Sequence, residues 1–307
     1  MDPLALVTKC LGQYKRLRNE ALYYCPFCSH HKQKLSVNTE SFFWKCWVCD
    51  AKGRSLFSLL RKHGNQECLT LYKKEFPEHF QPELAQIPKD FKLELPDEYV
   101  PLCSGSKTFD GRRALRYLKS RNVNSEAILR HKIGLASSGR YRDRVILPSF
   151  DADGRLNFYT GRTVTAEKEF RYLNPPTPSG YRNTIILNDL NIDWSKPIFL
   201  VEGFMDMIQA GSNAVPLFGS TLSESSRLFL EIVTHEPEVY VCLDSDARSK
   251  QINILSSLTS HGIICYDLDV SPYKDVGEMT RKILAEKQLA AQQADRVSLL
   301  RHRIRNL

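Results

Sequence analysis

Long apolar runs are missing from this sequence. Among its 307 residues the apolar stretches, such as 197–201 and 263–265, fall far short of the roughly 20 residues that a membrane-spanning helix needs. The first nine residues also lack the basic start and apolar run of a secretory signal, and we find no internal repeat or low-complexity segment. With 42% hydrophobic residues, the chain is expected to be globular and intracellular, and long enough for two domains.

Disulfide bonds are also not expected. The chain has nine cysteines, which in an intracellular protein serve metal sites or remain free thiols. Four of them form two CxxC pairs. The other five have no matching partner motif and are expected to be small buried apolar residues: Cys10, Cys68, Cys103, Cys242 and Cys265.

The net charge of +8 is unevenly distributed. Residues 1–62 carry 11 Lys+Arg against 4 Asp+Glu, and residues 105–195 carry 16 against 9, so each segment has a net charge of +7. The segments 63–104 and 196–307 are slightly acidic. Two basic segments favour two surfaces that face a polyanion, although a solvated charged surface would give the same pattern.

Two cysteine knuckles predict a metal site. Cys25-Pro-Phe-Cys28 and Cys46-Trp-Val-Cys49 are separated by 17 residues, which lets four thiolates close a tetrahedral site between two turns. So small a module has too little core to fold without its metal. We therefore predict one structural zinc ion, bound by these four cysteines.

Aromatic and basic residues surround the knuckles. This mixture suits stacking on bases and neutralising phosphates, and about half of the aromatic residues should instead form the core of the module. The residues concerned are Tyr23, Tyr24, Phe42, Phe43, Trp44, Trp47, Lys32, Lys34 and Lys45.

The patterns predict four parts along the chain. We expect a small β zinc ribbon over 1–62 and a proline-interrupted linker over 63–104. An α+β basic subdomain follows over 105–195, and an α/β region with a parallel sheet and a C-terminal helix over 196–307.

Several elements are predicted within these parts. We expect a helix over 4–17, two helices within 108–131, a hairpin of strands 144–150 and 155–160, and one long or broken helix over 276–304. Within the linker, residues 68–76 can still be helical.

Acidic residues follow two of the predicted parallel strands. Glu202 and Gly203 come directly after strand 198–201, and Asp244 and Asp246 follow strand 239–243. Because the carboxyl ends of parallel strands converge on one edge of a sheet, these carboxylates should cluster there. Clustered carboxylates suit magnesium or manganese, and two such ions about 4 Å apart can promote phosphoryl transfer.

At these residues the chain resembles the DnaG-type primases, and in size and zinc ribbon it is similar to the stand-alone primases of bacteriophages. The Toprim pattern of that family is matched by Val201-Glu202-Gly203 with Asp206, by Leu243-Asp244-Ser245-Asp246, and by Lys274-Asp275. The resemblance implies an acid/base or metal-binding role for Glu202, metal binding by Asp244 and Asp246, and support from Asp206 and Asp275. The chain departs from the family at Gly277, where another acid is usual.

The basic segment resembles the corresponding subdomain of the same family. The matching motifs are Tyr141-Arg142-Asp143-Arg144, Gly161-Arg162 and Phe170-Arg171-Tyr172-Leu173-Asn174, in which Arg171 replaces the usual lysine. The resemblance implies that nucleic acid or nucleotide is bound by Arg142, Arg144, Arg162, Arg171, Tyr172, Asn174 and Arg182.

The resemblance implies a DNA primase, a DNA-directed RNA polymerase that makes short RNA primers by metal-dependent nucleotidyl transfer. Its expected cofactors are one structural Zn²⁺ and two catalytic Mg²⁺ or Mn²⁺ ions. The expected partners are a single-stranded DNA template and ribonucleoside triphosphates, with no membrane, in a bacterial or phage-infected cytoplasm. Since the chain lacks a Gly-Lys-Ser/Thr loop, a replicative helicase must come from another chain, and a C-terminal helix with Leu299, Leu300 and Ile304 is a candidate to dock on it.

Toprim domains also occur in topoisomerases, nucleases and RecR-type repair clamps, so the fold alone leaves alternatives. The remaining residues cannot hold the tyrosine-bearing domains of a topoisomerase. A RecR-like zinc and Toprim protein is usually shorter and does not explain the arginine-rich hairpin. A Toprim nuclease would cleave DNA with the same acids.

Overall fold

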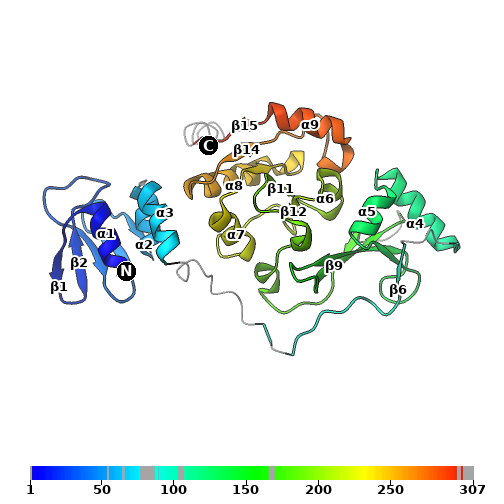
Figure 1. Ribbon diagram of the computed structural model, residues 1–307, viewed down its shortest axis with the longest axis horizontal. Coiled ribbons are helices and arrows are strands. Elements are labelled where there is room, and N and C mark those ends of the chain that lie inside the picture. The colour runs from blue at the N-terminus through cyan, green and yellow to red at the C-terminus, as the bar shows by residue number, and fades with distance from the viewer. Residues whose placement is uncertain are drawn as a thin grey trace. The chain divides into compact units, whose positions relative to one another are not determined.

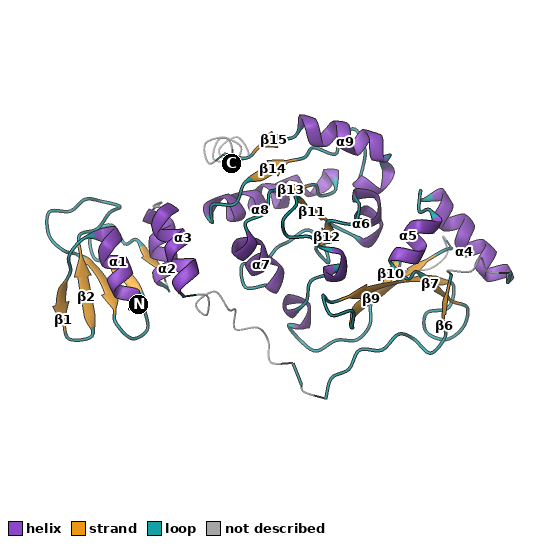
Figure 2. Cartoon of the chain, viewed as in Figure 1, coloured by secondary structure: helices purple, strands orange, loops and turns teal. Residues whose placement is uncertain are grey.

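The computed structural model describes residues 2–53, 55–63, 66–76, 87–88, 90–102, 107–165, 170–295 and 299. The chain divides into two compact units, Met1–Pro82 and Glu83–Leu307, which we describe separately. Over the described ranges, the strands form three five-stranded sheets, one in the first unit and two in the second (Figures 1 and 2). No helix in those ranges is long and apolar enough to cross a membrane.

The first unit is an antiparallel sheet with three helices. The strands follow one another in chain order: β1 (Lys15–Leu17), β2 (Glu20–Tyr23), β3 (Leu35–Asn38), β4 (Trp44–Cys46) and β5 (Lys52–Gly53). The helices are α1 (Pro3–Leu11), α2 (Leu56–His63) and α3 (Gln66–Glu75). Alternate strand residues such as Val37 and Trp44 pack with leucines of α1 and α2, so the helices cover one face of the sheet.

The predicted helix over 4–17 is shorter than expected. Asp2 caps its start by accepting from the Leu4 amide at 3.1 Å. Gly12 ends it with a φ of 85° and donates its N–H to the carbonyl of Thr8. The residues after Gly12 therefore form β1 instead of continuing the helix.

The structure differs from the predicted linker over 63–104 at both ends. Helix α3 lies within that range, and its Leu69 and Tyr72 are buried in the core of the first unit. At the other end, β6 (Tyr99–Pro101) pairs with a strand of the second unit. The helix allowed over 68–76 is thus present as α3, whereas β6 was not predicted because it is fixed by pairing with β7.

The expectation for two of the isolated cysteines was wrong. Cys10 and Cys68 form a disulfide with a Cα–Cα distance of 6.3 Å, because α1 and α3 pack together. The sequence carries no sign of this proximity, since 58 residues separate the pair. Cys242 and Cys265 are buried free thiols as predicted, and Cys103 lies outside the described residues.

The second unit begins with a mixed α/β layer. Its strands lie in the order β10 (Tyr172–Leu173), β9 (Leu156–Thr163), β8 (Arg144–Phe150), β7 (Gly134–Ala136) and β6, all antiparallel. The helices are α4 (Phe109–Ser120) and α5 (Ser125–Arg130), capped by Thr108 and Asn124. The predicted hairpin and helix pair are confirmed.

The second sheet of this unit is mainly parallel. Its order is β12 (Ala214–Pro216), β11 (Ile198–Val201), β13 (Val239–Val241), β14 (Cys265–Asp267) and β15 (Gln292–Gln293), with only β15 antiparallel. The helices are α6 (Phe204–Ala210), α7 (Arg227–His235), α8 (Arg248–Ser260) and α9 (Arg281–Ala290). Short 3₁₀ helices are η2 (Tyr181–Thr184), η3 (Asp189–Asn191), η4 (Ser245–Ala247) and η5 (Val276–Glu278).

Both faces of the parallel sheet are buried. Leu200 and Val241 point to a core formed with α7 and α8, whereas Phe199 and Tyr240 belong to a second core with α6 and α9. That second core also includes Val145 of the antiparallel layer. The antiparallel layer and the parallel sheet of the second unit therefore share one hydrophobic core.

The predicted helix over 276–304 is interrupted. Residues 276–278 form η5, α9 ends at Ala290, and β15 then adds an antiparallel edge strand to β14. Leu299 is buried against the α7 and α8 core. Of the three residues predicted to dock on a helicase, Leu299 is thus covered by this core, and Leu300 and Ile304 lie outside the described residues.

Candidate active site and zinc centre

Four cysteines of the first unit form a metal centre. The Cys25–Cys49 Sγ distance is 3.7 Å and the Cys28–Cys46 distance is 3.9 Å, and all four sulfurs lie within 4.8 Å of one another. A tetrahedron of Zn–S bonds of about 2.3 Å has S–S edges of about 3.8 Å, so the spacing fits zinc. The four predicted ligands therefore form a structural zinc site.

The sheet face opposite the helices carries polar and aromatic side chains. A hollow of about 710 Å³ on the first unit is lined by residues of β2 to β5 and the adjoining turns. Phe43 and Trp47 there are 55% and 65% exposed, and the Lys45 ammonium lies 4.8 Å from the Trp47 ring centroid. Trp44 instead is buried and donates to Ser55 and Ser58, so the aromatic residues divide between core and surface as expected.

The acidic residues meet at the point where the strand order of the parallel sheet reverses. Strand β11 has β12 on one side and β13 on the other, which makes its carboxyl end a topological switch point. Glu202 follows β11 and Asp244 follows β13, and the Asp244 amide donates to Glu202 Oε1 at 3.3 Å. The topology thus brings together two carboxylates that are 42 residues apart in the sequence.

Asp206 and Gly277 hold this edge together. Asp206 is buried on α6, where its Oδ2 accepts from the Gly203 amide at 3.1 Å and its Oδ1 from the Gly277 amide at 2.9 Å. A Cβ on Gly277 would stand 3.0 Å from that Oδ1 and 3.1 Å from Asp275 Oδ1. The glycine is therefore accounted for by crowding, which leaves little room for the additional acid usual in the family.

The surroundings of the acidic side chains disfavour their ionised forms. Burial, and then the nearby charges of Glu202, Asp206, Asp275 and Asp246, raise the pKa of Asp244 to about 7. Burial and Asp275 raise the pKa of Asp206 to about 6, and burial also raises the pKa of Glu202. Such shifts are typical of functional sites in which charge is balanced by a ligand.

One cavity of about 330 Å³ joins the acids to the basic layer. Its lining includes most of the predicted site residues, namely Glu202, Asp206, Asp244, Asp275, Arg162, Arg171, Tyr172 and Asn174. Asp246 lies on η4, is exposed and is not part of the lining, although its charge contributes to the raised pKa of Glu202 and of Asp244.

Arg162 is held between two tyrosines. It donates through Nε to the Tyr117 hydroxyl and through Nη1 to the Tyr172 hydroxyl, and its guanidinium lies 4.8 Å from the Tyr172 ring centroid. Asn174 accepts from Thr160 Oγ1 at 2.7 Å. These interactions fix cationic and amide groups opposite the acids.

Arg144 does not fit its predicted contact with nucleic acid. It is 5% exposed and donates to the backbone carbonyls of Gly161, Phe170 and Arg171 at 2.8–3.2 Å. The guanidinium N–H groups of Arg144 therefore stabilise the pairing of β9 with β10. The sequence motif indicated an arginine but not the direction of its side chain.

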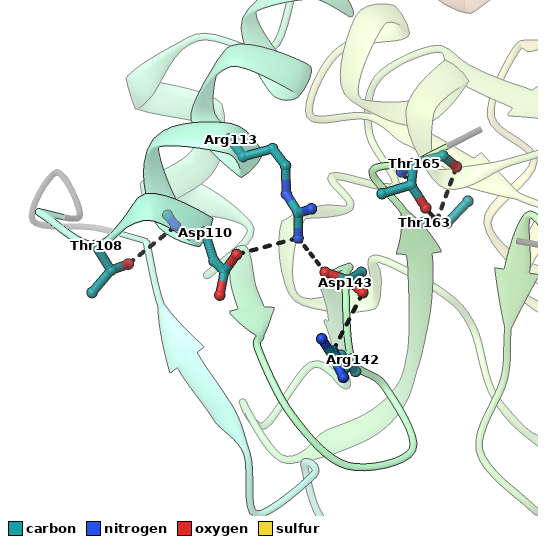
Figure 3. A network of polar contacts seen from close by, with 8 residues as sticks. Thr108, Asp110, Arg113, Arg142, Asp143, Thr163 and Thr165 are labelled. Atoms are coloured by element: carbon teal, nitrogen blue, oxygen red, sulfur yellow. Dashed lines mark hydrogen bonds and ion pairs between the residues drawn. The ribbon is translucent and has the colours of Figure 1, made fainter. Parts of the chain in front are cut away.

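Arg142 and Arg182 lie outside the cavity. Figure 3 shows Asp143 between Arg113 and Arg142, with Arg142 Nε 3.6 Å from Asp143 Oδ2 and Arg113 also 3.3 Å from Asp110. Arg182 lies 5.3 Å from the Phe218 ring centroid, beside a second cavity of about 220 Å³. The two cavities share Leu187, Pro216 and Phe218 in their linings.

Sequence reasoning missed two polar residues that shape the site. Gln251 is buried, and its Oε1 accepts from the Leu243 amide at 2.9 Å while its Nε2 donates to Asp267 at 2.7 Å. It thus fixes the end of the strand segment that carries Asp244. Arg121 lines the cavity beside Asp206, and neither residue lies in a recognisable motif.

The donor set of the acidic edge suits a hard divalent cation. Glu202 and Asp244 offer carboxylate oxygens within one cavity. Burial, and then the neighbouring acidic charges, raise their pKa values, and a bound cation would offset both effects. Lys274 directly precedes Asp275, and its carbonyl accepts from the Ser245 amide at 2.8 Å. This hydrogen bond connects the turn that carries Asp275 with the turn that carries Asp244.

Comparisons with known proteins agree with this geometry. No protein-family model matches the chain. It is 23% identical to a DNA primase of Staphylococcus epidermidis over 99% of this chain and 60% of that protein. It is 26% identical to a DNA primase of Pseudomonas putida over 77% of this chain and 44% of that protein. The chain therefore spans about half the length of these curated relatives.

Solved structures share its fold. The zinc-binding and RNA polymerase domains of the Aquifex aeolicus primase match 96% of this chain and 84% of that chain, with a TM-score of 0.53 and 17% identity. A DnaG primase catalytic domain bound to single-stranded DNA matches 61% of this chain and 74% of that one, with a TM-score of 0.52 and 18% identity. These likenesses confirm the predicted fold class, a zinc ribbon and a Toprim core.

Proposed function

Because the chain is a relative of the DnaG-type primases, we propose that it synthesises short RNA primers on a single-stranded DNA template. The observation that carries this proposal is one cavity whose lining contains the acids Glu202 and Asp244 together with Arg162 and Arg171. Acids at one side and fixed cations at the other suit a polyphosphate substrate whose charge must be held and redistributed.

Each side of the cavity has a distinct role in this proposal. Glu202 and Asp244, with Asp246 beside them, would hold two Mg²⁺ or Mn²⁺ ions. When bound, these ions activate the 3′-hydroxyl and stabilise the leaving pyrophosphate. Asp206 supports the edge by accepting from the Gly203 and Gly277 amides, and Asp275 lies close by in the same cavity lining.

The basic side would orient the nucleotide. Arg162 is pre-positioned by its two tyrosines, so binding a phosphate restricts its side chain little further. Arg171 is exposed at the cavity, and Arg142 and Arg182 extend the basic surface for template or nucleotide. Arg144 supports this layer through the backbone.

The rival functions of the Toprim fold make different products. A primase makes short RNA from single-stranded DNA, ribonucleotides and magnesium, whereas a nuclease cuts the DNA and a RecR-like clamp does neither. Incubating the full chain with these components and separating the products decides among them. DNA cleavage, or binding without any RNA product, would refute the proposal.

Replacing Arg171 with alanine is expected to weaken binding of single-stranded DNA and of nucleotide. Removing one ion pair between the protein and a DNA phosphate should reduce the slope of log affinity against log salt by about 0.7. The matched control is Arg155→Ala, because Arg155 is exposed at the hairpin turn and pairs with Asp153. An equal change of slope in both variants would remove Arg171 from the binding surface.

The C-terminal segment is proposed to dock on a replicative helicase carried by a separate chain. Deleting residues from Leu300 onward, which retains the buried Leu299, should reduce helicase stimulation of primer synthesis and leave basal synthesis unchanged. Loss of both activities would instead assign the segment to packing or DNA contact. In this role the chain would act where the chromosome is copied, in the bacterial or phage-infected cytoplasm.

A further inference from the structure

Arg121 places a guanidinium beside the acidic cluster. It follows α4, and its backbone carbonyl accepts from Gln209 Nε2 at 3.0 Å. Gln209 is buried on α6, the helix that carries Asp206. The backbone of Arg121 is therefore fixed to the same helix as the acid.

Three charged side chains converge on one point. The position that a Cβ of Gly277 would occupy lies 3.0 Å from Asp206 Oδ1, 3.1 Å from Asp275 Oδ1 and 3.3 Å from Arg121 Nη2. Both Arg121 Nε and Asp275 Oδ1 are buried without a hydrogen-bond partner in the described part of the chain. The absence of a side chain at Gly277 thus leaves the space into which the guanidinium projects.

Two carboxylates this close need a positive charge nearby. Burial, and then the charge of Asp275, raise the pKa of Asp206, whereas the charge of Arg121 lowers it. A Mg²⁺ ion at the same place would need oxygen ligands on all sides at about 2.0–2.1 Å. A guanidinium that occupies one side, with the same sign of charge, opposes such an ion.

We propose that Arg121 is a positioning residue that serves as a built-in cation. It balances Asp206 and Asp275 and restricts divalent cations to the side of the cavity formed by Glu202 and Asp244. The inference deepens the proposed function by dividing the five acids into two groups. Only the group around Glu202 and Asp244 exchanges its cation with solvent.

The test counts the Mn²⁺ ions bound to the full chain, from the electron paramagnetic resonance of free Mn²⁺ at about pH 8, where the carboxyls are ionised. Asp275→Asn should leave the number of bound ions unchanged, and Asp244→Asn should lower it. Arg121→Gln should gain one weak Mn²⁺ site, and adding Asp275→Asn to that variant should remove it.

Two controls separate charge balance from a general effect. Arg116→Gln removes a charge from the exposed side of α4, the helix that Arg121 follows. The Arg116→Gln chain should bind as many Mn²⁺ ions as the unchanged chain. Arg121→Lys keeps the charge and should not gain the extra site. A gain in either control, or no gain in Arg121→Gln, would overturn the proposal.

Loss of a bound ion on Asp275→Asn alone would also overturn it, and this variant decides the matter even where Arg121→Gln does not fold. Because ion counting requires no RNA synthesis, the two proposals can fail separately. A chain that makes no primers but shows this binding pattern refutes the primase function and leaves the role of Arg121 intact.

Discussion

Replacing Asp244 with asparagine is expected to lower primer synthesis by about a thousandfold or more, because several kcal/mol of transition-state stabilisation depend on the bound cations. Affinity for single-stranded DNA should stay close to that of the unchanged chain, since the basic side of the cavity is untouched. Primer synthesis on a fixed template and DNA binding by fluorescence anisotropy measure the two effects. Substantial RNA synthesis by this variant would remove Asp244 from the reaction.

The same substitution should stabilise the chain in the absence of metal. Burial and neighbouring acids raise the pKa of Asp244 from 3.8 to about 7, so the folded chain binds this proton more tightly than the unfolded chain does. Its contribution to stability is therefore favourable at low pH and is lost as the pH rises from about 4 to about 7. Above pH 7, in a buffer without Mg²⁺ or Mn²⁺ and without a chelator that would remove the zinc, Asp244→Asn should have the higher melting temperature.

A matched substitution controls for any effect of changing aspartate to asparagine. Asp153→Asn alters an exposed carboxylate at the hairpin turn, which lies outside the cavity lining. It should change neither primer synthesis nor the pH dependence of melting. Equal losses of activity in the two variants would show that the effect does not arise from the acidic edge.

The acidic edge could be predicted because strand periodicity and strand ends are local properties of a sequence. Apolar runs at 198–201 and 239–243 identify parallel strands. The residues that follow such strands meet at one edge of the sheet, independently of the length and conformation of the connecting segments. The zinc ligands were predictable for a similar reason, since the spacing of CxxC pairs already contains the geometry of the site.

What the sequence did not reveal depends on which side chains meet in three dimensions. Arg144 lies in a motif of exposed arginines, but the strand pair turns it inward onto three carbonyls. The Cys10–Cys68 disulfide depends on two helices that pack only after folding. Arg121 acquires its place because Gly277, far away in the sequence, has no side chain.

A prediction with an effect of similar size concerns the zinc ribbon. Replacing Cys46 with serine removes one of four thiolates, and a ribbon of this size depends on its metal for folding. We expect initiation on an unprimed template to fall by about a hundredfold or more, since a tethered binding module raises the local concentration of template by such factors. Extension of a supplied short RNA should continue at reduced efficiency, because the RNA–DNA duplex already holds the template in register.

The expectation follows from how the first unit is built. Its open sheet face exposes Phe43 and Trp47 beside Lys45, a surface for stacking and phosphate binding. The ribbon is therefore proposed to select and hold template and not to take part in phosphoryl transfer. A ribbon that only stabilises the chain predicts a different result, an equal loss of initiation and extension together with a lower melting temperature of the second unit.

Two further chains complete this test. Cys265→Ser places the same substitution in the core of the second unit, and it should not separate initiation from extension. A chain that begins at Glu83 removes the whole first unit and retains β6 in the antiparallel sheet. This shortened chain should extend a supplied RNA and fail to initiate, and an equal loss of both activities with an intact fold would refute the selecting role of the ribbon.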